Sequence, residues 1–287
     1  MKLYVEYFPH REYSSKVRPY LDKVMSTKPL RWGTQKSEEC IEVFSNAGGF
    51  KARLEFRISE KDIKKYSHFL LTSKKFYAES DSVHERNCDY MESQPVIKET
   101  ETGRFRNRDK VFVHKIKPEK NLIWGMSDST NFLSIKGTVE QLVDKFSGIL
   151  AVPVYHYKTN ELVEEWLSFR SDGYLEKFYM DETVKLIDDG FGYKTLRGSG
   201  LRSATKGDLQ QLPDFAHYPE ADFRGDSPYI ISREVLGFLL NAGIKSLSIC
   251  PLLEVESEQY QEYMNIWKSF KERISCNPEN EIEYLLG

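Results

Sequence analysis

The sequence predicts an α+β protein that has mainly antiparallel sheets, packed helices and two subdomains. Three observations support this fold class. With 287 residues, the chain is long enough for two domains. Segments with alternating apolar and polar residues, typical of half-buried strands, are interspersed with segments of helical spacing. Residues 1–150 carry 27 Lys and Arg against 21 Asp and Glu, whereas residues 151–287 carry 14 against 23. We therefore expect a basic domain over 1–147 and an acidic domain over 148–287.

The first half of the chain contains both kinds of segment. In order, its patterns predict a strand over 2–8, a helix over 12–25, a β-hairpin formed by 39–44 and 50–58, a helix over 60–78, a loop over 79–109 with one strand near 94–98, a strand over 110–116 and a continuation of the sheet over 121–124. The hairpin is expected because the turn-forming segment 45–49 separates two alternating stretches. The helix over 60–78 is expected because Ser59 and Asp62 have capping-box spacing.

The second half has clearer boundaries, especially towards its end. Its patterns predict a helix over 139–146, a strand over 149–157, a helix-like segment over 161–169, a strand over 174–180, a loop-rich region over 188–228, a strand over 229–231, a helix over 233–241, a strand over 246–255 and a helix over 258–274. Ser232 is a good N-cap for the helix over 233–241, and Gly243 is a good stop. No repeat with a fixed period is visible.

Composition excludes several classes of protein. Hydrophobic residues make up 40% and charged residues 30%, as in soluble globular proteins rather than disordered ones. The net charge of −3 argues against a dedicated nucleic-acid binder, which is usually strongly basic. No apolar run approaches the roughly 20 residues that span a bilayer. Four scattered cysteines do not form a disulfide framework. We therefore expect a cytoplasmic protein without membrane contact.

Metal and cofactor motifs are absent from the sequence. His84 and Cys88 are metal-capable, but a zinc protease motif needs His at both ends of a helical turn. The segment also reads as a loop, so a structural loop is the preferred interpretation. Asp188, Asp189 and Gly190 lack the spacing of a calcium-binding loop. We expect no metal, no cofactor and no enzymatic activity.

Two segments support alternative functions. Residues 197–203 are Gly-rich and basic, although they match neither a dinucleotide fingerprint nor a P-loop. An anion could bind there through backbone N–H groups, so a nuclease or nucleotide-modifying enzyme that uses the loop 198–207 is one alternative. Residues 104–120 interleave Lys and Arg with Phe105 and Phe112, as a nucleic-acid-binding module would. An ordinary strand with a solvated basic face explains the same pattern, and we prefer it.

Residues 222–255 have an order of elements that a known group of proteins shares. Asp222-Phe223-Arg224-Gly225 precedes a strand, a helix that starts after Ser232, and a final strand that contains Pro251. From about 215 to 255, the chain resembles the C-terminal region of bacterial immunity proteins from polymorphic toxin systems. The resemblance implies a cytoplasmic protein that binds a cognate toxin, occludes its active site and performs no chemistry.

The acidic second half suits a basic toxin domain, because opposite charge speeds association and supplies partners for Arg and Lys. Exposed carboxylates are the candidate partner-binding residues. They are Glu164, Glu165, Asp188, Asp189, Asp222 and Asp226. At helical spacing, Glu164 or Glu165 would share a face with Glu161. Nothing in the sequence implies the cleft that a catalytic role of Glu161, Glu164 and Glu165 would need, so a solvated face is preferred to that role.

Overall fold

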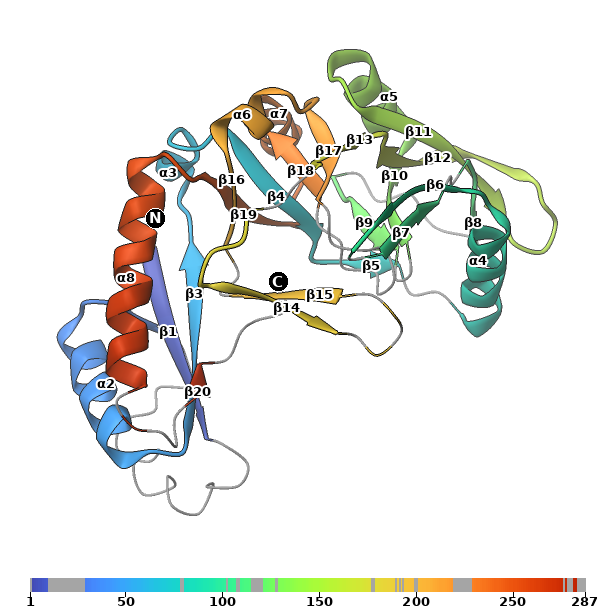
Figure 1. Ribbon diagram of the computed structural model, residues 1–287. Helices are drawn as coiled ribbons and strands as arrows, with labels where there is room; N and C mark the ends of the chain where they lie inside the picture. The colour runs from blue at the N-terminus through green and yellow to red at the C-terminus, as the bar shows by residue number, and fades with distance from the viewer. Residues whose placement is uncertain are drawn as a thin grey trace.

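The computed structural model describes residues 2–9, 29–77, 80–101, 103–106, 109–114, 121–126, 129–176, 179–188, 190, 192, 194–198, 201–218, 229–275, 277 and 281–282. They form seven helices and five sheets, of which two are six-stranded, curled and mixed (Figure 1). Most strand pairs are antiparallel. The predicted α+β class with two sheet subdomains is therefore confirmed. No helix in this part of the chain is long and apolar enough to cross a membrane.

A four-stranded sheet lies at one side of the molecule (Figure 1). Its order is β2 (Leu30–Arg31), β1 (Lys2–Pro9), β3 (Phe50–Arg57) and β20 (Glu281–Ile282). Helices α2 (Gln35–Ala47) and α8 (Glu258–Ile274) pack with it, and Val5, Phe44 and Trp267 share one core. The strand expected over 2–8 is confirmed, whereas the helix expected over 12–25 lies outside the described residues.

The predicted β-hairpin is wrong in its first arm, because residues 39–44 belong to α2. Cys40 and Phe44 alternate with polar residues, but they are also one helical turn apart, and both are buried. Thr34 caps the helix by accepting a backbone hydrogen bond, and Gly48 ends it with a φ of 72°. The glycines that resemble a hairpin turn therefore terminate a helix.

The first half-barrel is a six-stranded sheet at the opposite side of the molecule from α2 (Figure 1). Its order is β5 (Phe76–Tyr77), β9 (Trp124–Met126), β10 (Ser129–Ile135), β12 (Leu162–Ser171), β11 (Ile149–His156) and β8 (Val111–Val113). Helix α5 (Lys136–Lys145) connects β10 to β11. Both outer pairs are parallel and the inner pairs are antiparallel.

The second half-barrel has the order β13 (Gly173–Tyr174), β17 (Phe215–His217), β18 (Tyr229–Ser232), β4 (His68–Ser73), β19 (Leu247–Glu254) and β16 (Arg202–Ala204). Helix α7 (Arg233–Asn241) connects β18 to β19, and α6 (Lys206–Gln210) follows β16. Strands from both expected domains meet in each half-barrel: β4 lies between β18 and β19, and β12 lies between β10 and β11. The sheets therefore do not follow a boundary after residue 147.

The helix expected over 60–78 is wrong beyond its first turn. Helix α3 (Glu60–Ile63) has the predicted capping box of Ser59 and Asp62, but the chain then forms β4. Phe69, Leu70 and Leu71 are all buried, since β4 is a central strand that is covered on both faces. Such a continuous apolar run fits a buried helix as well as a central strand.

Two further expectations are corrected. The loop expected over 79–109 contains α4 (Asp81–Ser93), although a strand near 94–98 is confirmed as β6 (Val96–Thr100). The segment expected to be helix-like over 161–169 is a strand from residue 162, as part of β12, where the residues from Trp166 onward are largely buried. Elements with clear caps or long apolar stripes agree with the prediction: α5, β11, β18, α7, β19 and α8.

Two hairpins extend from the half-barrels. One consists of β6 and β7 (Gly103–Arg106), the other of β14 (Val184–Asp188) and β15 (Lys194–Gly198). We call residues 80–110 the first insert and residues 175–201 the second insert, because each lies between two short edge strands of one half-barrel. The second insert and the strands that follow it show that the region 188–228 is more regular than its loop-rich composition suggests.

Candidate functional site

Exposed apolar side chains gather on the two inserts. The described residues include seven large apolar side chains with high exposure, and five of them lie in an insert. These five are Val96, Ile97, Tyr179, Met180 and Ile187. Ile97 is 50% exposed on β6, and Ile187 is 42% exposed on β14. Apolar side chains concentrated on projecting elements mark sites of protein–protein contact more often than isolated surface residues do.

The two inserts touch each other. The backbone N–H of Lys194 at the start of β15 donates a 2.9 Å hydrogen bond to the carbonyl of Glu101, which follows β6 in the turn of the β6–β7 hairpin. The Nζ of Lys98 lies 2.7 Å from Glu176 Oε1 and 4.9 Å from the ring centre of Tyr174. The hairpins therefore hold each other in place, and we call their combined surface the insert surface.

The six carboxylates predicted from the sequence do not form one cluster among the described residues. Glu164 and Glu165 are both exposed on β12, and because that element is a strand their side chains point to opposite faces. Asp188 is exposed at the end of β14, where its Oδ1 accepts a 2.7 Å hydrogen bond from Gly190 N–H. The β11–β12 hairpin and the β14–β15 hairpin lie apart in Figure 1. The residues Asp189, Asp222 and Asp226 lie outside the described residues.

The Gly-rich segment 197–203 ends inside a sheet. Arg202 and Ser203 are 3% exposed and belong to β16, which pairs with β19. Tyr179 N–H donates a hydrogen bond to the Ser203 carbonyl and covers the free edge of that strand. Both side chains are therefore buried, and neither is presented to an anion in solution. Gly200 of the loop lies outside the described residues.

The described part of the basic segment 104–120 is engaged within the molecule. Arg104 Nε lies 2.9 Å from Glu99 Oε1, and Arg106 donates to the carbonyls of Glu92 and Gln94. Lys110 Nζ lies 4.5 Å above the ring of Tyr90. The ring of Phe112 is buried, so it is not presented for stacking on a base. These contacts favour the structural interpretation of the segment over a nucleic-acid interface.

His84 and Cys88 lie one turn apart on α4, where a loop was expected. Their Nε2 and Sγ atoms are 3.8 Å apart. A metal needs further ligands at comparable distances. Across the described ranges, no group of three His, Cys, Asp or Glu side chains is arranged to hold a metal ion.

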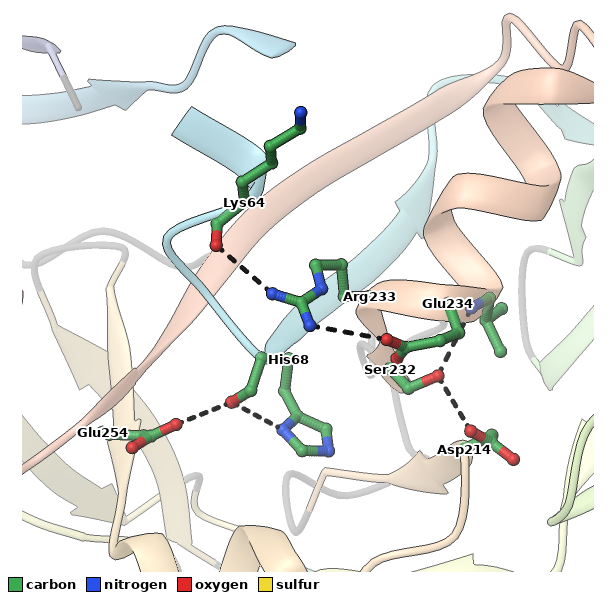
Figure 2. A network of polar contacts seen from close by, with 9 residues as sticks. Lys64, His68, Asp214, Ser232, Arg233, Glu234 and Glu254 are labelled. Carbon is green, nitrogen blue, oxygen red and sulfur yellow. Dashed lines mark hydrogen bonds and ion pairs between the residues drawn. The ribbon is translucent and has the colours of Figure 1, made fainter. Parts of the chain in front are cut away.

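A polar network joins the start of β4 to the end of β19 (Figure 2). Ser67 Oγ donates to Glu254 Oε1 at 2.8 Å, and His68 Nδ1 lies 3.0 Å from the same hydroxyl. A hydrolytic triad needs the imidazole between the hydroxyl and the carboxylate, whereas here the hydroxyl lies between the other two groups. Burial lowers the pKa of His68, against the opposing effect of nearby carboxylates. The arrangement is therefore that of a structural network.

A separate set of hydrogen bonds surrounds Asp214 at the N-terminus of α7 (Figure 2). Its carboxylate accepts hydrogen bonds from the backbone N–H and hydroxyl of Ser147 and from the hydroxyl of Ser232, which caps α7. Burial alone would raise the pKa of Asp214, but these hydrogen bonds outweigh it and hold the pKa below its ordinary value. Asp214 therefore fastens the end of α5 to the start of α7.

An open groove lies between α3 and α7. It is lined by Ile63, Lys64, Arg233, Gly237, Leu240 and Asn241. The guanidinium of Arg233 donates to the Lys64 carbonyl at 3.2 Å and lies 3.5 Å from Glu234 (Figure 2). Because this cation is already engaged within the chain, the groove offers weaker recognition chemistry than the insert surface does.

The sequence patterns missed the apolar residues of the inserts. Ile97 and Ile187 lie in short segments whose alternation indicates strands, and their flanking turns indicate hairpins. Nothing in that local pattern distinguishes a side chain packed in a core from one exposed on a projecting hairpin. No protein-family model matches the chain, and no curated protein matches it significantly.

Proposed function

We propose that this protein is an immunity protein that binds a cognate bacterial toxin domain in the cytoplasm and covers its active site. The observation that carries the proposal is the concentration of exposed apolar side chains on two inserts that brace each other. Apolar residues surrounded by polar ones are the usual anatomy of a protein interface. Asp188 is exposed on the same hairpin, next to Ile187, and supplies a carboxylate for a basic partner.

The C-terminal resemblance supports the same function. The strand, the Ser-capped helix and the Pro-containing strand on which it rests correspond to β18, α7 and β19. Helix α7 begins at Arg233, and Ser232 Oγ accepts from Val235 N–H as an N-cap does. The unit forms part of the second half-barrel, so in this proposal it supplies the scaffold and the inserts supply the contacts.

Co-expression with a bacterial toxin domain, sought first in the reading frames beside the gene, tests the proposal. The paired variant Ile97→Asp with Ile187→Asp should lose protection of the host cell and weaken toxin binding more than about tenfold, because it places two charges in a desolvated interface. The matched control is Leu162→Asp with Leu240→Asp, which changes two equally exposed leucines outside the inserts. This control should protect as well as the wild-type chain.

The outcomes separate the function from its location. If the wild-type chain neither binds nor neutralises the toxin, the proposed function is wrong. If both paired variants protect fully, the protein is an immunity protein that binds elsewhere. Toxin binding measured by calorimetry alongside cell survival distinguishes lost contact from lost expression.

A further inference from the structure

We infer that residues 68–156 and 162–254 are two copies of one folding unit, and that each copy gives its first strand to the sheet of the other. The first repeat contains β4, β5, β8, β9, β10, α5 and β11. The second contains β12, β13, β16, β17, β18, α7 and β19. Apart from α6, which lies between β16 and β17, the two orders agree element by element, and an insert follows the second strand in each. This inference stands independently of the proposed function.

The two half-barrels have the same sheet order. In each sheet the second strand of one repeat is followed by the fourth and fifth strands of that repeat. A central strand comes next, and then the last and third strands of the same repeat. Both outer pairs are parallel in both sheets. The central strand always comes from the other repeat: β12 in the first sheet and β4 in the second. Reciprocal exchange of this kind is typical of a swapped dimer.

The strand registers agree residue for residue. Pro153 is the fifth residue of β11 and lies opposite Leu167, whereas Pro251 is the fifth residue of β19 and lies opposite Phe69. Pro251 therefore follows Pro153 by the same number of residues by which Leu167 follows Phe69. The equivalent pairs on the other side of the central strands also agree. They are Phe132 with Phe169 and Tyr229 with Leu71.

A serine at the end of each exchanged strand makes the same contacts. Ser73 Oγ lies 2.8 Å from the carbonyl oxygen of Ile123 and accepts from Lys75 N–H. Ser171 Oγ lies 2.8 Å from the carbonyl oxygen of Phe215 and accepts from the N–H two residues later, that of Gly173. In both repeats the hydroxyl fixes the crossing of the chain from one half-barrel into the other.

The residues directly before the last strands of the two repeats make the same backbone contact: Asp172 N–H donates to the Gly148 carbonyl, and Lys74 N–H donates to the Ser246 carbonyl. Gly148 after α5 has a φ of 79°, and Gly243 after α7 has a φ of 74°. Each lies against the loop that precedes the fourth strand of the other repeat. A Cβ on Gly148 would lie 2.3 Å from the carbonyl oxygen of Phe215, and a Cβ on Gly243 would lie 3.8 Å from the Asn121 side chain. The two glycines are therefore not equivalent, and the pseudo-twofold relation after the helices rests on the matching backbone contacts of Gly148 and Ser246.

The repeats differ mainly in their inserts. The first insert contains α4 and β6–β7, and the second contains β14–β15. Both nevertheless cap an edge strand at the equivalent residue: Asn87 of α4 binds the backbone of Phe112, and Tyr179 binds the backbone of Ser203. The shared strands and helix form a scaffold, and the inserts are where the two copies have diverged.

If the connection between the repeats is shortened, this architecture predicts that the chain pairs with a second copy of itself. The connection is the turn 157–161 between β11 and β12, which pair within one sheet. If the turn cannot fold back, the first repeat of one chain can pair with the second repeat of another, and every strand contact is retained.

Deletion of residues 158–160 tests the inference. The deletion variant should have twice the molar mass of the wild-type chain by light scattering and the same circular dichroism spectrum. The matched control inserts four Gly and Ser residues between Lys158 and Thr159, and it should keep the wild-type mass. A folded deletion variant with the wild-type mass would overturn the inference.

A second measurement decides the matter if the deletion variant does not fold. A protease site placed in the lengthened turn allows the folded, full-length chain to be cut between its repeats. The two fragments should elute together under native conditions, because each contains the central strand of the other's sheet. Separation of the fragments as folded species would contradict the exchange.

Discussion

The ring centres of Phe132 and Tyr229 lie 5.2 Å apart, and the two residues occupy the same position in the two repeats. A residue close to a twofold axis meets its own counterpart, so this contact marks the pseudo-twofold axis of the molecule. Both side chains belong to the largest core, to which both half-barrels contribute. That core is in effect the interface of a dimer whose subunits are joined in one chain.

Substitution of the axial rings should destabilise the whole of both half-barrels. We expect Phe132→Ala and Tyr229→Ala each to lower the free energy of unfolding by about 3–5 kcal/mol, the usual cost of a buried aromatic truncation. The double variant should cost about 0.5–1.5 kcal/mol less than the sum, since the rings contact each other. Urea unfolding measures all three values. Strict additivity would mean that the rings do not interact in solution.

Gly148→Ala should be strongly destabilising. The new Cβ would meet the Phe215 carbonyl, and the positive φ disfavours any side chain. Together these effects should cost about 3–5 kcal/mol. Gly237→Ala in the middle of α7 is the matched control, because its Cβ meets no atom within 4 Å. The control should gain about 0.5–1 kcal/mol from helix propensity, as measured by thermal unfolding.

Stability should fall in mild acid because of His68. Burial lowers the pKa of His68 in the folded protein below its ordinary value of 6.5, so the unfolded chain binds the proton more tightly. The contribution of neutral His68 to the free energy of unfolding is complete above pH 6.5, and it is lost as the pH falls through the lowered pKa of the folded protein. His68→Asn should therefore lose less unfolding free energy than the wild-type chain between pH 7 and pH 5. Equal losses in denaturant titrations would show that other groups determine this dependence.

The predicted carboxylates should be tested as two separate groups. Asp188→Lys should slow toxin association about 3–10-fold at low salt, with a smaller effect at 0.5 M salt, because Asp188 lies on the insert surface. Glu164→Lys with Glu165→Lys changes a different hairpin and should leave the association rate nearly unchanged. Stopped-flow kinetics distinguish the two. The opposite result would move the binding surface to β12.

Asn87→Ala should expose the edge of the first half-barrel. The side-chain amide of Asn87 donates to the Phe112 carbonyl and accepts from the Phe112 N–H, both at 2.9 Å. Loss of both bonds should cost about 1–3 kcal/mol and increase aggregation at high concentration. Glu85→Ala removes an exposed polar side chain from the same helix and serves as the control. Light scattering during incubation at 37 °C compares the two variants.

Local signals predicted those elements whose ends are marked in the sequence. Helices α7 and α8 begin after Ser232 and Ser257, whose hydroxyls cap them, and each has a buried stripe. The strand β4 was missed because Phe69–Leu71 is apolar on both faces, and only its place in the centre of a sheet explains that pattern.

The repeat was invisible for a related reason. Equivalent residues such as Val111 and Arg202, or Gly125 and His217, have different chemistry, and only their pairing partners reveal the equivalence. The carboxylates could be recognised as charged surface from the sequence. Their distribution over separate hairpins depends on long-range pairing, which no local pattern encodes.

Helix α8, near the end of the chain, completes two cores whose other residues are synthesised much earlier. Its first turns bring Tyr260 and Tyr263 to the core between the half-barrels, and its later turns bring Trp267 and Phe270 to the core that contains Val5. Neither core can close until the ribosome has translated residues up to the 270s, roughly 10–50 s after Val5 at ordinary elongation rates. Val5 must remain without this cover for that period. The folded scaffold, and any binding surface that depends on it, is therefore complete only after α8 has been made.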